Sequence, residues 1–377
     1  MSLTARVARS LAAIAMTCVA TVVPGTAAAW GATGAPVPPG FQANSVTWLS
    51  PELGWVLGAV PCGSSTCSDV IGSTDGGATW HQVGTSTVPI ADLGRNRPGV
   101  TDVRFATAAV GWAFGPFLLR TDDGGKTWSR ETIPGGGKQV LALATSLSAA
   151  YAIVSDCAFG RGLCGRPLSL WRTTPGASTW TRVRLNLPEQ VAADVAVHGK
   201  TVYVVDSQFE FGHPDVFYAS IDGRNFSPRR GPCANTKDIG LVQAVPTSAT
   251  DVAMLCDGNP GFSKAIKTVY TSGDTGRTDT FRGRMGLFGI QAQLAVSPTG
   301  NLAVASWSDG SFIYINDTHA RTWTMVEGIG DGGAGWNDIT YVTRSTAWVV
   351  YGPAGFSGIG QLWVTRDGGQ HWSAVTL

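Results

Sequence analysis

Three short stretches of the sequence place an aspartate beside two glycines, a combination that can hold a metal ion or a phosphate group. The aspartates are Asp75, Asp123 and Asp367, and each is followed within five residues by a tryptophan. Such an Asp can equally accept hydrogen bonds from its own turn, while the glycines permit the positive φ angles of a tight hairpin. Because the stretch recurs along the chain, we favour the structural interpretation and expect no catalysis and no metal at these carboxylates.

Four weaker copies keep a polar residue at the start and an aromatic residue at the end. They are Thr173 to Trp180, Ser220 to Phe226 with Asp222 at its centre, Ser272 to Phe281, and Asn316 to Trp323. The seven starting positions, from Ser73 to Thr365, are separated by 48, 52, 47, 52, 44 and 49 residues. A period near 50 residues predicts seven structural repeats that share one continuous core.

Upstream of each turn, two apolar runs are joined by a short polar link, as in 45–49 and 54–57. Each repeat therefore reads as strand, link, strand, loop, strand, turn and strand, which is a four-stranded antiparallel meander. Seven such units predict an all-β fold, a seven-bladed β-propeller spanning 41–377. Because the chain begins with a first strand and ends with a fourth, we expect the ring to close without borrowing a strand.

Aromatic residues recur at corresponding places in these runs. They could stack on sugars, but recurrence in repeat after repeat favours packing between neighbouring sheets. The residues assigned to the core are Trp48, Trp55, Phe105, Trp112, Tyr203, Tyr341 and Trp348.

Residues 1–29 read as a secretory signal peptide, with Arg6 and Arg9, an apolar run, and a small-residue cleavage site that ends at Ala29. Residues 30–40 are rich in Gly and Pro and read as a tether before a single propeller domain. No later segment has the length of a membrane span. We therefore expect a secreted monomer, cleaved after Ala29.

The charge balance argues against nucleic acid as a partner. The whole chain has 27 Lys and Arg against 26 Asp and Glu, and loss of Arg6 and Arg9 leaves a net charge of about −1. Six cysteines follow the signal segment, and export makes disulfides plausible. We expect the pairs Cys62 with Cys67, Cys157 with Cys164, and Cys233 with Cys256, and no cofactor.

The motif Ser/Thr-x-Asp-x-Gly-x-Thr-Trp resembles the Asp-box or BNR repeat of sialidases, xyloglucanases, sortilin-type receptors and photosystem II assembly-factor propellers. The resemblance covers 41–377 and is specific for architecture rather than activity. A sialidase-type site would need an arginine cluster, a Tyr paired with a Glu and an acidic residue. This chain lacks an Arg-x-Pro signature before its first Asp-box, and sialidase rings have six blades. The photosystem II assembly-factor type is more similar, and that resemblance implies a scaffold that binds protein.

In a meander, the links between strands one and two emerge on the same side as the Asp-box turns, which we call the Asp-box face. The opposite side, the loop face, receives the loops after strand two and the connections between blades. All three expected disulfides fall there, and irregular loops on a rigid scaffold often carry recognition. The candidate ligand-binding residues on the loop face are Arg95, Arg97, Asp156, Arg161, Arg166, His213, Asp215, Arg282, Arg284 and Trp336.

Two functions follow from these candidates. The first is a non-catalytic recognition or scaffold module that holds an extracellular protein or glycan through the loop face. The alternative is an exo-acting glycoside hydrolase of sialidase or xyloglucanase type, with two carboxylates such as Asp156 and Asp215 facing each other across the channel.

Overall fold

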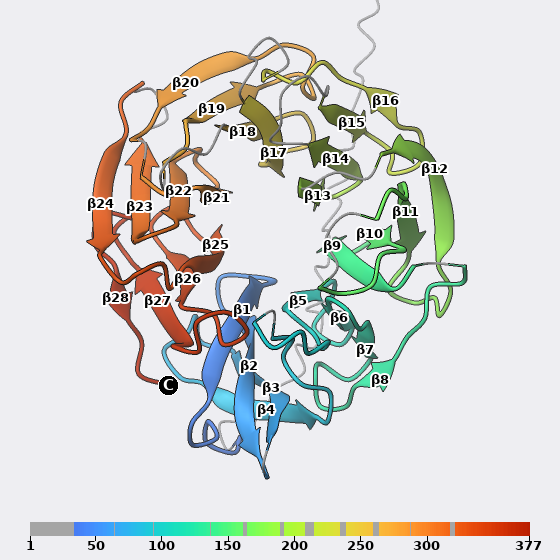
Figure 1. Ribbon diagram of the computed structural model, residues 1–377, viewed down its shortest axis with the longest axis vertical. Helices are drawn as coiled ribbons and strands as arrows, with labels where there is room; N and C mark the ends of the chain where they lie inside the picture. The colour runs from blue at the N-terminus through green and yellow to red at the C-terminus, as the bar shows by residue number, and fades with distance from the viewer. Residues whose placement is uncertain are drawn as a thin grey trace, which may run out of the picture.

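The computed structural model describes residues 34–63, 65–92, 94–135, 137–160, 164–188, 192–207, 215–233, 239–258, 264–286, 288–316 and 321–377. These residues form seven four-stranded antiparallel sheets and contain no α-helix. Figure 1 shows the sheets arranged as blades around a central opening, with the first strand of each blade innermost. The predicted all-β, seven-bladed propeller is confirmed. The expected signal peptide lies outside the described residues.

Each blade takes four consecutive strands in chain order. The first three blades are β1 (Gln42–Trp48), β2 (Gly54–Cys62), β3 (Ser65–Ser73), β4 (His81–Ser86); β5 (Asp102–Phe105), β6 (Gly111–Phe114), β7 (Leu119–Thr121), β8 (Ser129–Arg130); and β9 (Gln139–Thr145), β10 (Ala150–Ser155), β11 (Leu168–Thr173), β12 (Thr181–Leu187). Blades four and five are β13 (Ala192–His198), β14 (Thr201–Ser207), β15 (Val216–Ser220), β16 (Ser227–Pro228); and β17 (Ile239–Pro246), β18 (Val252–Gly258), β19 (Lys267–Ser272), β20 (Thr280–Arg284). Blades six and seven are β21 (Gln291–Val296), β22 (Leu302–Trp307), β23 (Ser311–Asn316), β24 (Thr324–Ile329); and β25 (Trp336–Tyr341), β26 (Ala347–Tyr351), β27 (Gln361–Thr365), β28 (Ser373–Ala374).

The core consists of apolar clusters between neighbouring blades. Trp55 of blade one stacks on Phe105 of blade two with ring centroids 3.8 Å apart. Of the seven aromatic residues assigned to the core, five are buried, and Trp48 and Tyr341 are partly buried but pack against the clusters at the two sides of blade seven. Large rings wedged between twisted sheets explain why tryptophan recurs with the repeat.

The Asp-box turns are held by their own side chains. In the first turn, Ser73 Oγ donates to Asp75 Oδ1 (2.8 Å), and the amide and hydroxyl of Thr79 donate to the two carboxylate oxygens (2.9 and 2.6 Å). Gly77 has a φ of 79°, and a Cβ there would lie 2.4 Å from the Trp348 ring of the last blade. Glycine is therefore required both by the turn and by the neighbouring blade.

The same arrangement surrounds Asp123 and Asp367, with His371 Nδ1 in place of the threonine hydroxyl at Asp367. Asp222 instead accepts from the amides of Arg224 and Asn225. The structure adds Asp274, which the sequence analysis passed over: it accepts from Ser272 Oγ and from the amide and hydroxyl of Thr278. These hydrogen bonds satisfy the carboxylates within their own turns.

The ring closes without a shared strand, because blades one and seven each consist of four consecutive strands. Ala43 N donates to Gly360 O, and Ala354 N donates to Ala43 O. Val37, Phe41 and the C-terminal Leu377 pack against the cluster between blades seven and one. Residues 34–40, expected to be a tether, therefore contribute to this junction, next to the C-terminus that Figure 1 marks.

Candidate functional site

The structure forms the three expected disulfides, Cys62–Cys67, Cys157–Cys164 and Cys233–Cys256. The first spans the loop between β2 and β3, and the second lies in the loop between β10 and β11. The third ties the connection into blade five to β18. All three brace connections after strand two or between blades, so they lie on the loop face.

Arg95 and Arg97 share the connection from blade one to blade two. Asp92 Oδ1 accepts from the amide of Arg95 (2.9 Å), and their side chains form a loose ion pair at 3.7 Å. Backbone hydrogen bonds between Asp92 and Arg97 close the loop tip. Both arginines are therefore carried by a braced loop, with the Arg95 side chain 77% exposed.

This connection touches two other loops. A Cβ at Gly355, in the loop after β26, would lie 2.4 Å from Ala91 O, and one at Gly160 would lie 2.0 Å from Asn96 Oδ1. Gly160 lies within the disulfide loop of blade three, next to the exposed Asp156. We call 87–92, 94–100, 352–360 and 156–160 together the loop platform. It joins parts of blades seven, one, two and three into one surface.

The other candidates are dispersed. Arg166 is exposed at the far end of the blade-three loop, and Arg284 is exposed at the end of the outer strand β20. Arg282 donates from Nε to Thr271 Oγ1 within blade five (2.8 Å). Arg161 and His213 lie outside the described residues.

Two candidates have structural roles. Asp215 accepts from Ser207 Oγ (2.6 Å) and from the amide of Leu241 (2.8 Å), which ties blade four to blade five. Burial raises the pKa of this carboxyl. Trp336 is 1% exposed and packs against Tyr351 and Trp363, so its assignment to the ligand-binding surface is corrected to the core.

Sequence reasoning missed two apolar side chains on the loop platform, Phe356 and Ile359. Both lie in the loop between β26 and β27, and Phe356 is 61% exposed. Hydrogen bonds to Pro353 O and from Gly360 N to Gly352 O hold the loop. The Gly-Pro-Ala-Gly sequence before Phe356 is typical of a turn, but nothing in it indicates that the phenylalanine is exposed.

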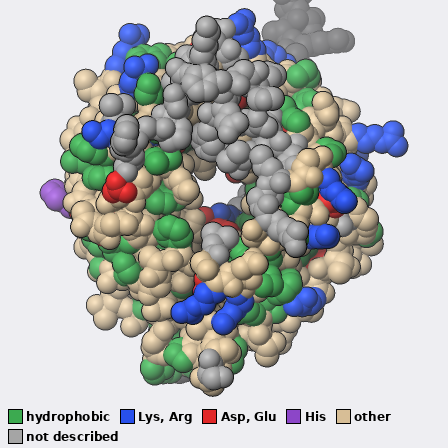
Figure 2. Space-filling model, viewed as in Figure 1, with side chains coloured by type: hydrophobic (Ala, Val, Ile, Leu, Met, Phe, Trp, Pro, Cys, Tyr) green, Lys and Arg blue, Asp and Glu red, His purple; other side chains and the backbone are tan. Residues whose placement is uncertain are grey.

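The second candidate region is the central channel, a cavity of about 1070 Å³ lined by residues of all seven blades. Figure 2 shows its opening at the centre of the ring, with charged side chains at the margin. Most of the lining comes from the innermost strands and from the links that follow them.

One level of the channel wall is mainly polar. Strand pairing identifies the equivalent residue of each innermost strand. In blade one, Gly54 of the second strand pairs with Ser73, the first residue of the Asp-box, and Leu57, three positions after Gly54, pairs with Ser45 of the innermost strand. The same count from the Ser, Thr or Asn that begins each turn gives one innermost residue in every blade. Six of the seven equivalent residues are polar, and blade three has an alanine. They are Ser45, Asp102, Ala142, Asp194, Gln243, Gln293 and Asn337, and all of them except the fully buried Ser45 line the channel.

We call this set the polar ring, and hydrogen bonds connect much of it between blades. Gln293 Nε2 donates to Asn337 Oδ1 (3.1 Å), and Asn337 Nδ2 donates to Asn44 O (2.8 Å). Gln243 Oε1 accepts from the amide of Leu294 (2.6 Å). Asn337 Nδ2 also donates to Asp102 Oδ1 (3.4 Å), and Ser45 Oγ accepts from the amide of Val103 (3.1 Å). The connected part therefore runs from blade five through blades six, seven and one to blade two, and it does not include blade three.

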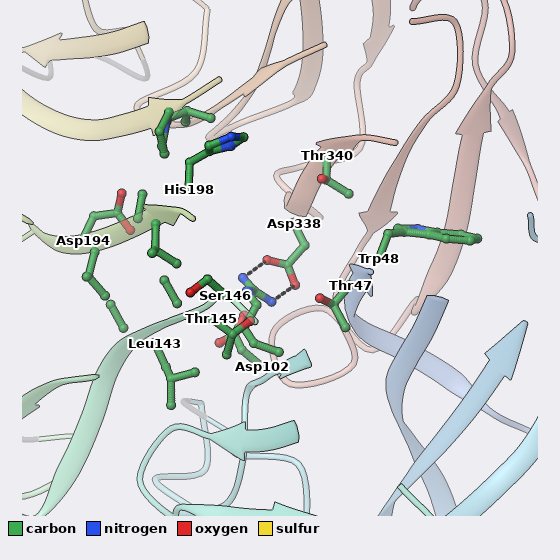
Figure 3. Close-up of a pocket in the computed structure, with 18 of the residues that line it drawn as sticks. Thr47, Trp48, Asp102, Leu143, Thr145, Ser146, Asp194, His198, Asp338 and Thr340 are labelled. Atoms are coloured by element: carbon green, nitrogen blue, oxygen red, sulfur yellow. Dashed lines mark hydrogen bonds and ion pairs between the residues drawn. The ribbon is translucent and has the colours of Figure 1, made fainter. Parts of the chain in front are cut away.

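Next to the polar ring, Asp338 joins three blades. Its carboxylate pairs with both terminal nitrogens of Arg104 (2.5 and 3.2 Å) and accepts from Ser45 Oγ and the amide of Val46 (3.1 Å). Figure 3 shows Asp338 on one side of the channel and Asp194 and His198 on another. Asp338 has a φ of 54°, in a bulged part of β25.

Two channel carboxyls have raised pKa values. Burial and then the nearby charge of Asp338 raise the pKa of Asp102. Burial raises the pKa of Asp194 to about 6, although Arg104 acts in the opposite direction. The sequence signal for these residues was their place at the start of the innermost strands, where a polar residue precedes an apolar run.

Within the part of the chain that the structure describes, no three His, Cys, Asp or Glu side chains are grouped so as to hold a metal ion. Nor do those residues include a helix long and apolar enough to cross a bilayer.

Comparison with known proteins supports the architecture. Residues 119–130 match the family model for the BNR/Asp-box repeat. No curated protein matches the sequence. Similar solved structures include YCF48 from Cyanidioschyzon merolae (17% identity, 73% of this chain and 84% of that one, TM-score 0.48) and one described as YCF48 bound to D1 peptide (17%, 73% and 80%, 0.47). Another is oligogalacturonate lyase from Vibrio parahaemolyticus (8%, 88% and 92%, 0.55). At 8% identity the likeness to the lyase concerns the fold alone.

Proposed function

We propose that this chain, an Asp-box β-propeller, is a secreted, non-catalytic recognition module that holds an extracellular protein through its loop platform. The observation that carries the proposal is that all three disulfides brace the loop face. In the described part of that face, no repeated turn motif stabilises the connections. Rigid loops lose less conformational entropy on binding than mobile ones.

The chemistry of the loop platform fits a protein ligand. The exposed Phe356 and Ile359 supply apolar contact area, and Arg95 and Arg97 supply charge on the loop that contacts theirs at Gly355 and Ala91. Aromatic and arginine side chains are enriched in protein interfaces. An extracellular glycan is the other ligand class that such a surface could hold. The N-terminal signal pattern and the three disulfides both support secretion.

The hydrolase alternative has less support. Of its two carboxylates, Asp215 is engaged by Ser207 and by the amide of Leu241 between two blades. Asp156 lies on the loop of blade three. A paired acid and nucleophile would both need access to the substrate.

The test uses the chain from residue 30 onward, immobilised and exposed to culture medium with chemical cross-linking, and in parallel a glycan array and a panel of aryl glycosides. Phe356→Asp should abolish retention of a specific protein. The matched control, Ile221→Asp, alters an equally exposed apolar residue of the Asp-box turn in blade four and should change nothing. Equal retention by both variants would contradict the proposal, array binding would favour a glycan, and glycoside turnover would favour the hydrolase.

A further inference from the structure

The Asp-box turn of blade five contains a residue in a strained backbone conformation. Thr275 has a φ of 63°, whereas the residues at the same position in the turns of Asp75, Asp123 and Asp367 are glycines. A β-branched residue is unfavourable in this region, and strain of this kind is found mainly at functional sites, where neighbouring contacts maintain it. The contacts of Thr275 therefore indicate what the strained conformation serves.

The hydroxyl of the buried Thr275 brings two arginines together. Its Oγ1 accepts from Arg277 Nη1 of the same turn (3.1 Å) and from Arg229 Nη2 of blade four (3.5 Å), and it donates to Asp274 O (2.6 Å). Arg229 is also held by Nε, which donates to Thr275 O (3.0 Å), and by Nη1, which donates to Pro228 O (3.1 Å). Because a hydroxyl offers one donor and two acceptor positions, this one is fully used in orienting the two guanidinium groups. A glycine at this position would provide no such acceptor.

The two arginines have no carboxylate partner. Arg229 and Arg277 form no ion pair with the residues that the structure describes. The nearby Asp274 carboxylate already accepts from Ser272, from Thr278 and from the amide of Arg277. Burial and then the charge of Arg277 lower the pKa of Arg229, and the opposite effect of Asp274 is smaller. Two like charges are thus held next to each other by hydrogen bonds to neutral oxygens.

Both guanidinium groups keep donors for a ligand. Arg277 is exposed, and its Nε and Nη2 have no acceptor among the described residues. Arg229 is half-buried, and Nη2 uses one of its two N–H groups on the Thr275 hydroxyl. Planar guanidinium groups with several N–H donors bind oxyanions through charge-assisted hydrogen bonds.

We propose that Arg229 and Arg277 form a binding site for a tetrahedral oxyanion, either inorganic phosphate or the phosphate ester group of a larger ligand. Its two negative charges match the two guanidinium groups, and its several oxygens can accept from both at once. Thr275 is the positioning residue, because its hydroxyl orients both arginines without contacting the anion. The site lies at the junction of blades four and five on the Asp-box face, and it does not depend on the loop platform.

The experiment is calorimetric titration of the chain from residue 30 onward with inorganic phosphate, with methyl phosphate and with acetate. Low ionic strength is needed because Arg277 is open to solvent. Phosphate should bind at least about tenfold more tightly than acetate, a planar anion with one charge. Tighter binding of methyl phosphate than of inorganic phosphate would identify an ester group as the natural ligand, and the reverse would identify the free ion.

Arg277→Gln should weaken phosphate binding by about tenfold, because it removes one of the two charges. The matched control is Arg344→Gln, which alters another exposed arginine of the Asp-box face, in the link between β25 and β26 of blade seven. This variant should bind phosphate as the unaltered chain does.

Thr275→Gly separates the positioning role from a purely structural one. Glycine relieves the strain, so the midpoint of thermal unfolding should not fall, but loss of the shared acceptor should weaken phosphate binding by about fivefold. Thr275→Ser keeps the hydroxyl and should retain most of the affinity. Unchanged binding by Thr275→Gly would overturn the role given to Thr275.

Three results would overturn the site itself. They are absence of saturable binding at about 10 mM phosphate, equal affinity for phosphate and acetate, and equal affinity of Arg277→Gln and Arg344→Gln for phosphate. Each would leave the loop-platform proposal standing, because the probes require no contact with that face.

Discussion

The aspartates of the Asp-box turns and those of the central channel are the same residue type in opposite settings. In the turns, Asp274 accepts from the backbone of Thr278, and this hydrogen bond together with those from Ser272 and the Thr278 hydroxyl lowers its pKa to about 2. In the channel, burial raises the pKa of Asp194 to about 6. The turn carboxylates stabilise the fold as anions, whereas ionisation of Asp194 opposes folding.

The difference shows where free energy is available for binding. A carboxylate whose hydrogen bonds are all made within its own turn gains little free energy from a ligand. A desolvated carboxylate without such hydrogen bonds is stabilised by a counter-ion. Asp338 lies in the channel wall but resembles the turn aspartates, because Arg104, Ser45 and Val46 satisfy it.

The strongest test of this comparison is Asp338→Ala. The change leaves Arg104 without its partner near the junction of three blades and places alanine at a positive φ, so we expect a loss of about 3 to 5 kcal/mol of unfolding free energy. Urea denaturation measures it. Asp338→Asn tolerates the same φ and keeps an acceptor, and should cost less. A loss below about 1 kcal/mol for the alanine variant would mean that this ion pair does not hold the junction.

Asp123→Ala should cost about 1 to 2 kcal/mol, because the hydroxyl of Thr121 and the amide and hydroxyl of Thr127 lose their acceptor. Asp122→Ala in the same turn is the matched control. The Asp122 side chain is exposed, and its partner Arg120 is largely buried but keeps Glu131 and the carbonyl of Pro175 when Asp122 is removed. Loss of this half-exposed pair should cost about 0.5 kcal/mol. Equal losses for the two variants would show that the motif aspartate has no special role.

Asp194→Asn should stabilise the fold by about 1 to 2 kcal/mol at pH 8 and have little effect at pH 4. The sign follows from the pKa of Asp194, which is raised from 3.8 to about 6. A raised carboxyl pKa means that stability is lost as pH rises through the interval between these values. Thermal unfolding at the two pH values measures the difference, and a destabilised variant at pH 8 would contradict burial as the dominant influence.

The smallest expected effect is at Asp367, whose pKa is about 2: partial desolvation acts upward, but hydrogen bonds from His371 and Thr365 outweigh it. A lowered pKa stabilises the fold above the unfolded value, and this contribution disappears as pH falls from about 4 to about 2. The difference in stability between the unaltered chain and Asp367→Asn, below about 1 kcal/mol at pH 6, should therefore shrink to a small fraction of that value at pH 2. A difference independent of pH would mean that ionisation plays no part.

The turns could be predicted from sequence because every partner of Asp75 or Asp123 lies within four residues of it. Because each turn motif is a short contiguous stretch, its copies could be counted in the sequence, and that count predicted the number of blades. Asp274 was missed because the stretch was measured to Phe281, although Ser272, Asp274 and Thr278 keep the motif spacing.

The channel could not be predicted in the same way. Asp338 contacts Ser45, which is 293 residues away in the sequence, and Arg104, which is 234 residues away. Only closure of the ring brings these residues together. Trp336 was misplaced for a related reason, since it was read as part of a connection although it begins β25 and packs in the core. Exposure of Phe356 likewise depends on how one loop rests on its neighbours.

The junction between the first and last blades contains no interlocked strand, only backbone hydrogen bonds, side-chain contacts and apolar packing. The N- and C-termini could therefore lie at a junction between two other blades without disrupting a sheet. A circular permutant that links Leu377 to residue 34 and opens between two other blades keeps every sheet intact. For the same reason, duplication of a whole blade during evolution would have left the other sheets intact.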